Sequence, residues 1–391
     1  MAIYLDNHAT TRLDPRVLEA MLPWLGDHCG NAGSLTHAFG REAREAVERA
    51  REQVAVAVGA VPREIIFTSG ATESANLAIL GSAERPGREG GRLVSWVSEH
   101  PAVLDPLEHL AAGGFDVSLL GVALQGADAV GQIDLDELRG ACVDGTFLVS
   151  LLLANNEIGT IQPAAAAAEI THACGALLHL DAAQALGKTP IRVDELGADL
   201  MSLSAHKFHG PKGIGALFVR RRERVARLTP QVFGGGQERG LRSGTLNVPG
   251  IVGMGVAAEL ATTRLETDAA AMGTLRDRLW RRLCELVPDV HLNGPSLTTP
   301  GLRLPGNLNV RIGGVDGQTL LATLGEGDLA VSSGSACSSA SPRPSHVLRA
   351  LGLDDDQARA SLRFGLSRFT TADEIDRAAD LIAAAVARLR A

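Results

Sequence analysis

The chain has 391 residues, of which 45% are hydrophobic and 21% are charged, and its formal net charge at pH 7 is −8. This length allows a sizeable core and two domains, and the composition is that of a globular protein rather than a disordered or fibrous one. The net negative charge argues against nucleic-acid binding, no apolar stretch reaches the roughly 20 residues of a membrane span, and the first residues do not resemble a signal peptide. We therefore expect a cytoplasmic protein that binds neither membranes nor nucleic acids directly.

Short apolar runs alternate with helical segments between about residue 60 and residue 220. Such an alternation predicts an α/β fold, with a mostly parallel sheet and helices on its faces. The expected strands are residues 65–67, 93–97, 147–153, 177–180, 200–203 and 216–219, and helices are expected at residues 72–80 and 163–174.

The pattern changes beyond about residue 255 and predicts a smaller α+β domain, joined to the first by a long helix. We place the large domain at residues 14–258 and the small domain at residues 259–391, together with residues 1–13. Within the small domain we expect helices at residues 259–287, 318–324 and 373–389 and a strand at residues 308–312.

Polar side chains follow the expected strands of the large domain at their C-terminal ends. These ends share one edge of a parallel sheet, where open α/β sheets bind ligands. One of them delivers Lys207 into a loop rich in glycine and proline. A buried lysine at such a place is a good Schiff-base former, because burial lowers its pKa and leaves a nucleophilic amine. An aldehyde cofactor on Lys207 would also need a phosphate site, an acid for a ring nitrogen and a stacking group.

Candidates for these three parts stand at other strand ends. Residues 70–73 lie where a strand turns into a helix, and the free N–H groups there favour a phosphate, although a plain helix cap is the alternative. His100 either stacks on a cofactor ring and relays protons or lies in a surface loop. Asp181 ends a buried strand and needs a partner, for which a protonated pyridine nitrogen is suitable, and Gln184 could meet a ring hydroxyl.

Two further segments bear on function. The glycine-rich residues 234–245 form either a flexible connector or a phosphate contact through Thr245, which need not be made within one chain. Arg363 alternates with apolar neighbours at strand-like spacing, so it either clamps a substrate carboxylate or makes a surface ion pair.

The five cysteines are widely spaced and include no Cys-x-x-Cys pair, so they indicate neither a disulfide framework nor a zinc site. Cys142, Cys174 and Cys284 lie in helical patterns, where we expect small buried thiols, and Cys29 lies in a polar loop. Cys337 lies among small residues in a loop that we expect to be mobile. A lone cysteine can be inert, but an exposed mobile thiol suits a group that travels to a substrate and then to a partner.

Together these motifs resemble the pyridoxal-phosphate (PLP)-dependent cysteine desulfurases, within the class-V branch of the fold-type I aminotransferase superfamily. The Ser-Ser-Gly-Ser-Ala-Cys form of the thiol loop is similar to the NifS/IscS-type branch. The matching motifs are residues 4–7, 9–11, 68–73, 99–100, 155–159, 181–184, 204–213, 242–245 and 332–338.

The resemblance implies a homodimeric enzyme that converts L-cysteine to L-alanine and leaves a persulfide on Cys337. Lys207 would hold PLP covalently and move the substrate's Cα proton, and His100 would stack on the ring as acid–base catalyst. The remaining implied contacts are Ala71, Thr72, Ser204, His206 and, from the neighbouring subunit, Thr245 for the phosphate, Asp181 and Gln184 for the ring nitrogen and hydroxyl, and Asn156 and Arg363 for orienting the ring and the substrate carboxylate.

The resemblance leaves the sulfur acceptor open. An iron–sulfur scaffold protein, a tRNA-thiolation relay, a DNA-modification system and a biosynthetic pathway are all compatible. No resident metal is implied, although Cys337 could transiently ligate an iron–sulfur cluster. Residues 121–131 are longer than a compact family connection, so we expect a surface elaboration, and the chain ends at Ala391 without the tail that some housekeeping members use to deliver sulfur to a scaffold.

Two alternative functions remain. The same fold could serve an aminotransferase or a selenocysteine lyase, and Cys337 is the discriminating residue because a transaminase does not need it. A non-catalytic interaction protein that retains the fold is the other alternative.

Overall fold

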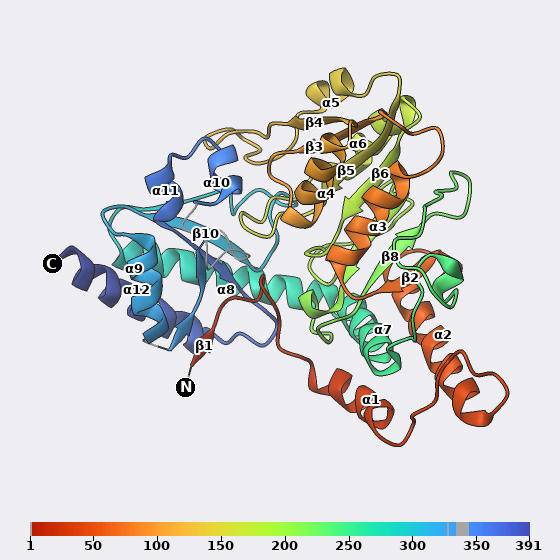
Figure 1. Cartoon of the computed structure of the whole chain (residues 1–391). Helices are drawn as coiled ribbons and strands as arrows, with labels where there is room; N and C mark the ends of the chain where they lie inside the picture. Colours follow the sequence, from red (N-terminus) through yellow and green to blue (C-terminus); the bar gives the residue numbers. More distant parts are fainter. Residues whose placement is uncertain (1, 327, 334–343) are drawn as a thin grey trace.

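The computed structural model of the chain describes residues 2–326, 328–333 and 344–391, and Cys337 lies outside them (Figure 1). Its larger sheet has the strand order β2-β8-β7-β6-β5-β3-β4. β8 is antiparallel to its neighbours β2 and β7, and the other adjacent pairs are parallel, which confirms the predicted mostly parallel sheet. The strands are β2 (Ile65–Thr68), β3 (Arg92–Trp96), β4 (Asp116–Leu120), β5 (Thr146–Leu152), β6 (Leu177–Asp181), β7 (Leu200–Ser204) and β8 (Gly215–Val219).

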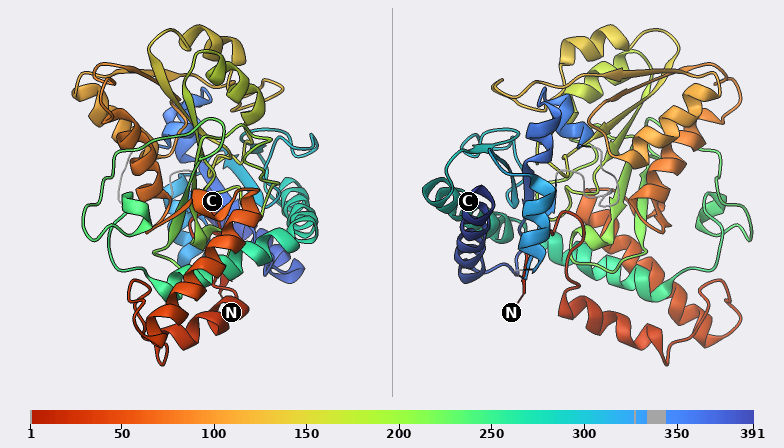
Figure 2. Two further views of the ribbon diagram at one scale, coloured as in Figure 1. Left: turned by 90° about the vertical axis from the view of Figure 1, so that its right-hand side faces the viewer. Right: turned by 60° about the vertical axis from the view of Figure 1, so that its left-hand side comes forward.

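Both faces of this sheet are buried, which explains why its strands are continuously apolar. Ile65 and Phe67 of β2 join one hydrophobic cluster, whereas Ile66 between them joins another on the opposite face. β4 was missed by the sequence analysis because it is an edge strand that is only partly buried. The covering helices are α1 (Pro15–Leu25), α2 (Ala38–Val58), α3 (Ala71–Ala83), α4 (Pro101–Ala112), α5 (Leu135–Ala141), α6 (Ala164–Ala173) and α7 (Val248–Thr263), and α1 and α2 both pack on α7 (Figure 2).

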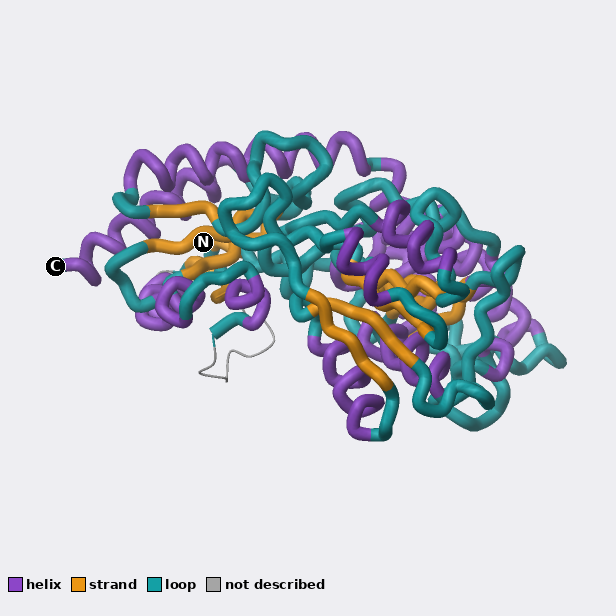
Figure 3. Tube along the Cα trace, turned by 90° about the horizontal axis from the view of Figure 1, so that it is seen from above, coloured by secondary structure: helices purple, strands orange, loops and turns teal. Residues whose placement is uncertain are grey.

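A smaller antiparallel sheet, in the order β12-β13-β10-β9, lies apart from the larger one (Figure 3). A two-stranded parallel sheet of β1 and β11 lies beside it, so that Ile3 and Leu5 share a core with residues of the last third of the chain. The elements are β1 (Ile3–Tyr4), α8 (Leu265–Leu286), β9 (Val290–Leu292), β10 (Asn307–Ile312), α9 (Gly317–Glu326), β11 (Leu329–Ala330), β12 (Ser332–Ser333), α10 (His346–Ala350), α11 (Asp355–Arg359), β13 (Ser361–Gly365) and α12 (Ala372–Arg390).

The structure corrects the single long helix predicted at residues 259–287. α7 ends and α8 begins at Arg264, whose ψ of 1° interrupts the helical backbone. The sequence has no proline or glycine at this point, so the break follows from packing. Met254 of α7 lies in a core of the larger sheet, whereas Leu279 of α8 lies in the core of the smaller one.

Two smaller expectations are also corrected. Cys284 is exposed on α8 rather than buried, and Cys142 and Cys174 are only partly buried at the ends of α5 and α6. The segment 121–131 is more than a surface elaboration, because Gln125 contacts the C-terminal third of the chain. Its backbone N–H donates to the Leu351 carbonyl (2.9 Å), and its side chain forms hydrogen bonds with the backbone of residues 292 and 294.

In the part of the chain that the structure describes, no helix is both long and apolar enough to cross a membrane.

A buried ion pair anchors the glycine-rich segment 234–245 to the larger sheet. The Glu238 carboxylate accepts two hydrogen bonds from the Arg51 guanidinium (2.7 and 2.8 Å) and one from the Phe67 backbone N–H (2.7 Å). Both charged side chains are almost fully buried. The segment is therefore not a free connector at this point.

Replacing Glu238 with glutamine should lower the free energy of unfolding by about 3–5 kcal/mol, because it leaves the Arg51 charge buried without its counter-ion. Urea denaturation measures this loss. Glu48→Gln is the matched control, since Glu48 contacts the same guanidinium from the solvent side (3.2 Å) and should cost under about 1 kcal/mol. Equal losses in the two variants would contradict the burial argument.

Candidate active site

A cavity of about 500 Å³ lies at the C-terminal edge of the larger sheet. Its walls come from the loops after β2, β3, β5, β6 and β7 and from the N-terminal segment His8–Thr10, so residues far apart in sequence meet there. The structure brings these predicted residues together around it: Ala71, Thr72, His100, Asn156, Asp181, Gln184, Ser204, His206 and Lys207.

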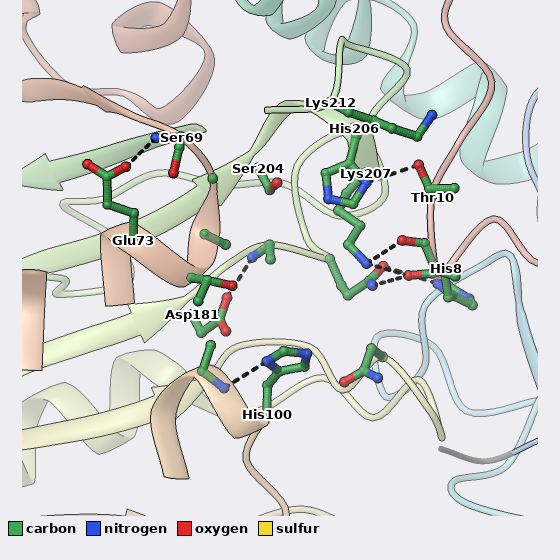
Figure 4. Close-up of a pocket in the computed structure, with 18 of the residues that line it drawn as sticks. His8, Thr10, Ser69, Glu73, His100, Asp181, Ser204, His206, Lys207 and Lys212 are labelled. Carbon is green, nitrogen blue, oxygen red and sulfur yellow. Dashed lines mark hydrogen bonds between the residues drawn. The ribbon is translucent and has the colours of Figure 1, made fainter. Parts of the chain in front are cut away.

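Lys207 lies directly after β7, in the 3-10 turn Ala205–Lys207. Its Nζ donates hydrogen bonds to the backbone carbonyls of His8 (2.6 Å) and Ala9 (2.8 Å) at one side of the cavity (Figure 4). These N-terminal residues were not among the predicted site residues. The only signal for them was the likeness of residues 9–11 to the family motif. The amine is thus presented to the cavity by the end of a rigid strand.

Asp181 ends β6 and is only 2% exposed. Burial raises the pKa of its carboxyl to about 6, despite the opposing effects of the Ala183 N–H bond (3.0 Å) and of Lys207. Among the described residues no salt bridge to Asp181 is found within 4.0 Å. A buried carboxyl of this kind favours a cationic ligand in the cavity. A protonated pyridine nitrogen fits this requirement.

His100 is the N-cap residue of α4 and faces the same cavity (Figure 4). Its Nδ1 accepts the Ala102 backbone N–H (3.0 Å), so the ring proton of the neutral form is on Nε2. Burial lowers the pKa of His100 to about 4, with further lowering by Lys207 and His346. The imidazole is therefore neutral at pH 7, with one N–H to donate.

The start of α3 suits a phosphate. Gly70 is its N-cap and has no capping side chain, so the first N–H groups, at Ala71 and Thr72, are available at the positive end of the helix dipole. A Cβ on Gly215 of β8 would lie 2.6 Å from the Gly70 Cα, so only glycine there allows this turn to pass so close to the strand. Ser204, His206 and Lys212 line the same cavity, and Lys212 is a cation that the sequence analysis did not single out.

Two of the predicted residues that the structure describes, Arg363 and Thr245, do not line the cavity. Arg363 is fully buried in β13, where Nη2 pairs with Asp6 (2.8 Å) and Nη1 donates to the Asn156 carbonyl (3.2 Å). Thr245 is exposed on the loop before α7. Cys337 lies outside the described residues. Within the described ranges, no group of three or more His, Cys, Asp and Glu side chains could hold a metal.

Comparison with known proteins identifies the family. A family model described as aminotransferase class-V matches residues 3–378. The cysteine desulfurase IscS of Anaeromyxobacter sp. (strain Fw109-5) is 51% identical over 388 residues, which are 99% of this chain and 93% of that protein. The chain belongs to the cysteine desulfurases of the class-V aminotransferase family. This membership confirms the predicted fold class, enzyme class and PLP cofactor.

Other relatives agree with this assignment. The cysteine desulfurase IscS of Rickettsia felis is 48% identical over 390 residues, which are 100% of this chain and 92% of that protein. A solved structure of a NifS-like protein has a TM-score of 0.90 and 39% identity, with both chains covered fully. The NifS/IscS-type resemblance is therefore confirmed, and the desulfurase is favoured over both alternatives. The roles of the individual residues stay predictions.

Proposed function

We propose that the chain removes sulfur from L-cysteine, gives L-alanine and a persulfide on Cys337, and passes the sulfur to an acceptor protein in the cytoplasm. The observation that carries this proposal is the cavity that Lys207, His100 and Asp181 line together. Among the described residues Asp181 has no salt-bridge partner within 4.0 Å, so its carboxyl is suited to a cationic ligand. The names of the IscS relatives support the substrate.

The residues around the cavity fit PLP. Asp181 would hold the ring nitrogen, Gln184 the ring oxygen, and the start of α3 with Ser204 and His206 the phosphate, while His100 would stack on the ring. When bound, PLP withdraws electrons from the bonds at the substrate Cα.

Lys207 and His100 would handle the protons. The Lys207 amine, once released from its carbonyl partners, would move the proton at the substrate Cα. His100 is neutral and carries its proton on Nε2, so it can donate that proton and take it back within the cavity. Arg363 would orient the substrate carboxylate, and for this it would exchange its contact with Asp6 or with the Asn156 carbonyl.

Cys337 would take the sulfur. Its thiolate would attack the substrate sulfur, so that an S–S bond forms as the Cβ–S bond breaks, and the electron pair that stays on carbon takes up a proton to give alanine. The ends of the loop lie beside the site: Ser333 pairs with Leu362 in β13, and the Ser345 hydroxyl donates to the Glu157 carboxylate. These attachments support the proposal that Cys337 delivers its thiolate to the cavity.

A neutral replacement of Asp181 tests the cofactor placement. Asp181→Asn should lower kcat/KM for cysteine by about 10²–10³-fold, or about 3–4 kcal/mol, because an amide cannot stabilise a protonated ring nitrogen. The rate of alanine release measures the loss, and absorbance confirms that PLP is still bound. A variant with undiminished turnover would contradict the role of Asp181.

We also propose a homodimer in which Thr245 contacts the phosphate of the neighbouring subunit. Thr245 is exposed and does not line the cavity of its own chain. Large apolar side chains are exposed nearby in sequence, Phe233 at 79%, and along α1 at Leu18, Leu22 and Leu25. A second copy of the chain would cover such surfaces.

Light scattering of Phe233→Asp should report the mass of one chain where the original protein gives two. The same variant should bind PLP more weakly, because a monomer lacks the second chain's Thr245. An original protein that is monomeric while fully active would rule out the shared site.

The division into domains at residues 14–258 and at 259–391 with 1–13 remains our proposal. The separate core that joins Ile3 and Leu5 to residues of α8 and α12 supports it. Six buried residues of the proposed small domain beyond α7 are exceptions, since they pack in the core of the larger sheet: Leu304, Val347, Leu348, Leu351, Leu353 and Ala358.

Among acceptors we favour an iron–sulfur scaffold protein, following the IscS relatives. Incubation of the enzyme with radiolabelled cysteine and cell extract, followed by capture of labelled proteins, tests this choice. Label on a tRNA-thiolation or DNA-modification protein instead would identify a different acceptor, while the proposed desulfurase reaction would stand.

A further inference from the structure

A second lysine lies behind the cavity, and the sequence analysis assigned it no role. Lys188 follows β6 and is 8% exposed. Its Nζ donates to Oε1 of Gln184 at 2.7 Å. Burial lowers the pKa of Lys188 to about 7, with Lys207 and Arg363 adding to the effect. Both the charged and the neutral amine can donate N–H, so the contact does not depend on the protonation state.

The amide of Gln184 has three polar contacts that define its orientation. Oε1 accepts from Lys188 and lies 3.1 Å from Nδ1 of His8, and Nε2 donates to the His8 backbone carbonyl at 2.8 Å. In a flipped amide, Nε2 would face the lysine, which is a donor in this contact, and Oε1 would face the carbonyl, which only accepts. The flipped state is therefore excluded, and Nδ1 of His8 carries the ring proton.

This orientation determines what Gln184 offers to the cavity. Both lone pairs of Oε1 are used by Lys188 and His8, whereas Nε2 has a second N–H beyond the one that bonds the His8 carbonyl. Gln184 is 2% exposed and lines the cavity. A ligand oxygen beside this amide therefore meets an N–H donor and not a carbonyl. An N–H donor stabilises an anionic oxygen, and a carbonyl would repel it.

We propose that Lys188 and His8 are positioning residues that hold the Gln184 amide with its N–H toward the cofactor's ring oxygen. This inference rests on the proposed placement of Gln184 at that oxygen. In this role both side chains act through Gln184, whereas the contact of His8 with Lys207 is made by its backbone carbonyl. Their effect is to keep the ring oxygen anionic by excluding the amide orientation that would oppose its charge.

The test is the pH midpoint at which the PLP-loaded enzyme changes its visible absorbance, recorded without cysteine. Lys188→Met removes the donor to Oε1 and frees the amide to turn. Without the N–H donor the anionic ring oxygen is less stabilised, and it holds a proton beside it more tightly. The pH midpoint of the absorbance change should therefore rise by about one unit, a tenfold change in proton affinity. Gln184→Met alone should give a similar rise.

The double variant separates positioning from simple loss of charge. If Lys188 acts through Gln184, Lys188→Met in the Gln184→Met background should move the midpoint by less than about 0.2 units, because coupled residues are not additive. A full additional shift would show that the lysine charge acts directly and would overturn the proposal. An unchanged midpoint in Lys188→Met would overturn it as well.

Two further variants keep the proposal testable if Lys188→Met does not fold. Lys188→Gln keeps a neutral donor at this position and should stay closer to the original midpoint than Lys188→Met. If neither Lys188 variant folds, His8→Phe is compared in the two Gln184 backgrounds, with a smaller rise expected only where Gln184 is present. Because no cysteine is added, failure here is distinct from failure of the desulfurase assignment, which alanine release from the original enzyme tests.

Discussion

Replacing Cys337 with serine should leave PLP bound and the enzyme yellow, but should reduce alanine and persulfide formation by about 10³-fold or more, equivalent to about 4 kcal/mol of transition-state stabilisation. A cysteine thiol is a few per cent ionised at pH 7 and is intrinsically nucleophilic, whereas a serine hydroxyl is neither. Amino-acid analysis of released alanine and mass spectrometry of the protein measure the two products.

The matched control is Cys284→Ser, because Cys284 is an exposed thiol on α8 outside the active site. It should behave as the original protein does. Unchanged sulfide release from Cys337→Ser in the presence of a thiol reductant would disprove the assignment of Cys337 as the sulfur-accepting residue.

Replacing Lys207 with alanine should abolish the visible absorbance of covalently bound PLP and lower turnover by about 10⁴-fold or more. The variant loses both the amine that bonds the cofactor and the base for the Cα proton, so two contributions disappear together. Absorbance after reconstitution with PLP, together with alanine release, measures both effects.

Lys212→Ala serves as the comparison, since Lys212 is the other lysine that lines the cavity. Its removal should weaken PLP binding while the yellow absorbance at saturating PLP is retained. Full activity in Lys207→Ala would refute the covalent role of Lys207, and loss of the absorbance in Lys212→Ala alone would point to Lys212 instead.

The sheet was predictable because its strands are buried on both faces, and such strands are visible as short apolar runs. Secondary-structure elements could not be predicted correctly where an element is only partly buried or where packing overrides the local sequence pattern. β4 is a partly exposed edge strand and was missed. The helical pattern of residues 259–287 continues through Arg264, yet the backbone breaks there because the two halves pack in different cores.

The site was predictable to the extent that its residues follow parallel strands. Lys207, Asp181 and His100 each come at or just after a strand end, and strand ends share an edge. His8 and Lys188 follow no such rule. His8 belongs to an N-terminal segment that reaches the cavity only through tertiary contacts, and Lys188 acts through the side chain of Gln184.

The sequence by itself therefore determined the fold class and the principal chemical groups, because residue type and strand-end position are local properties, and the family that its motifs resemble implied the cofactor. Only the tertiary structure decided the protonation and orientation of those groups. Burial raises the pKa of Asp181, and burial together with the charges of Lys207 and His346 lowers that of His100. A lysine and a backbone carbonyl together allow a single orientation of the Gln184 amide. These effects depend on distances between segments that the order of residues does not contain.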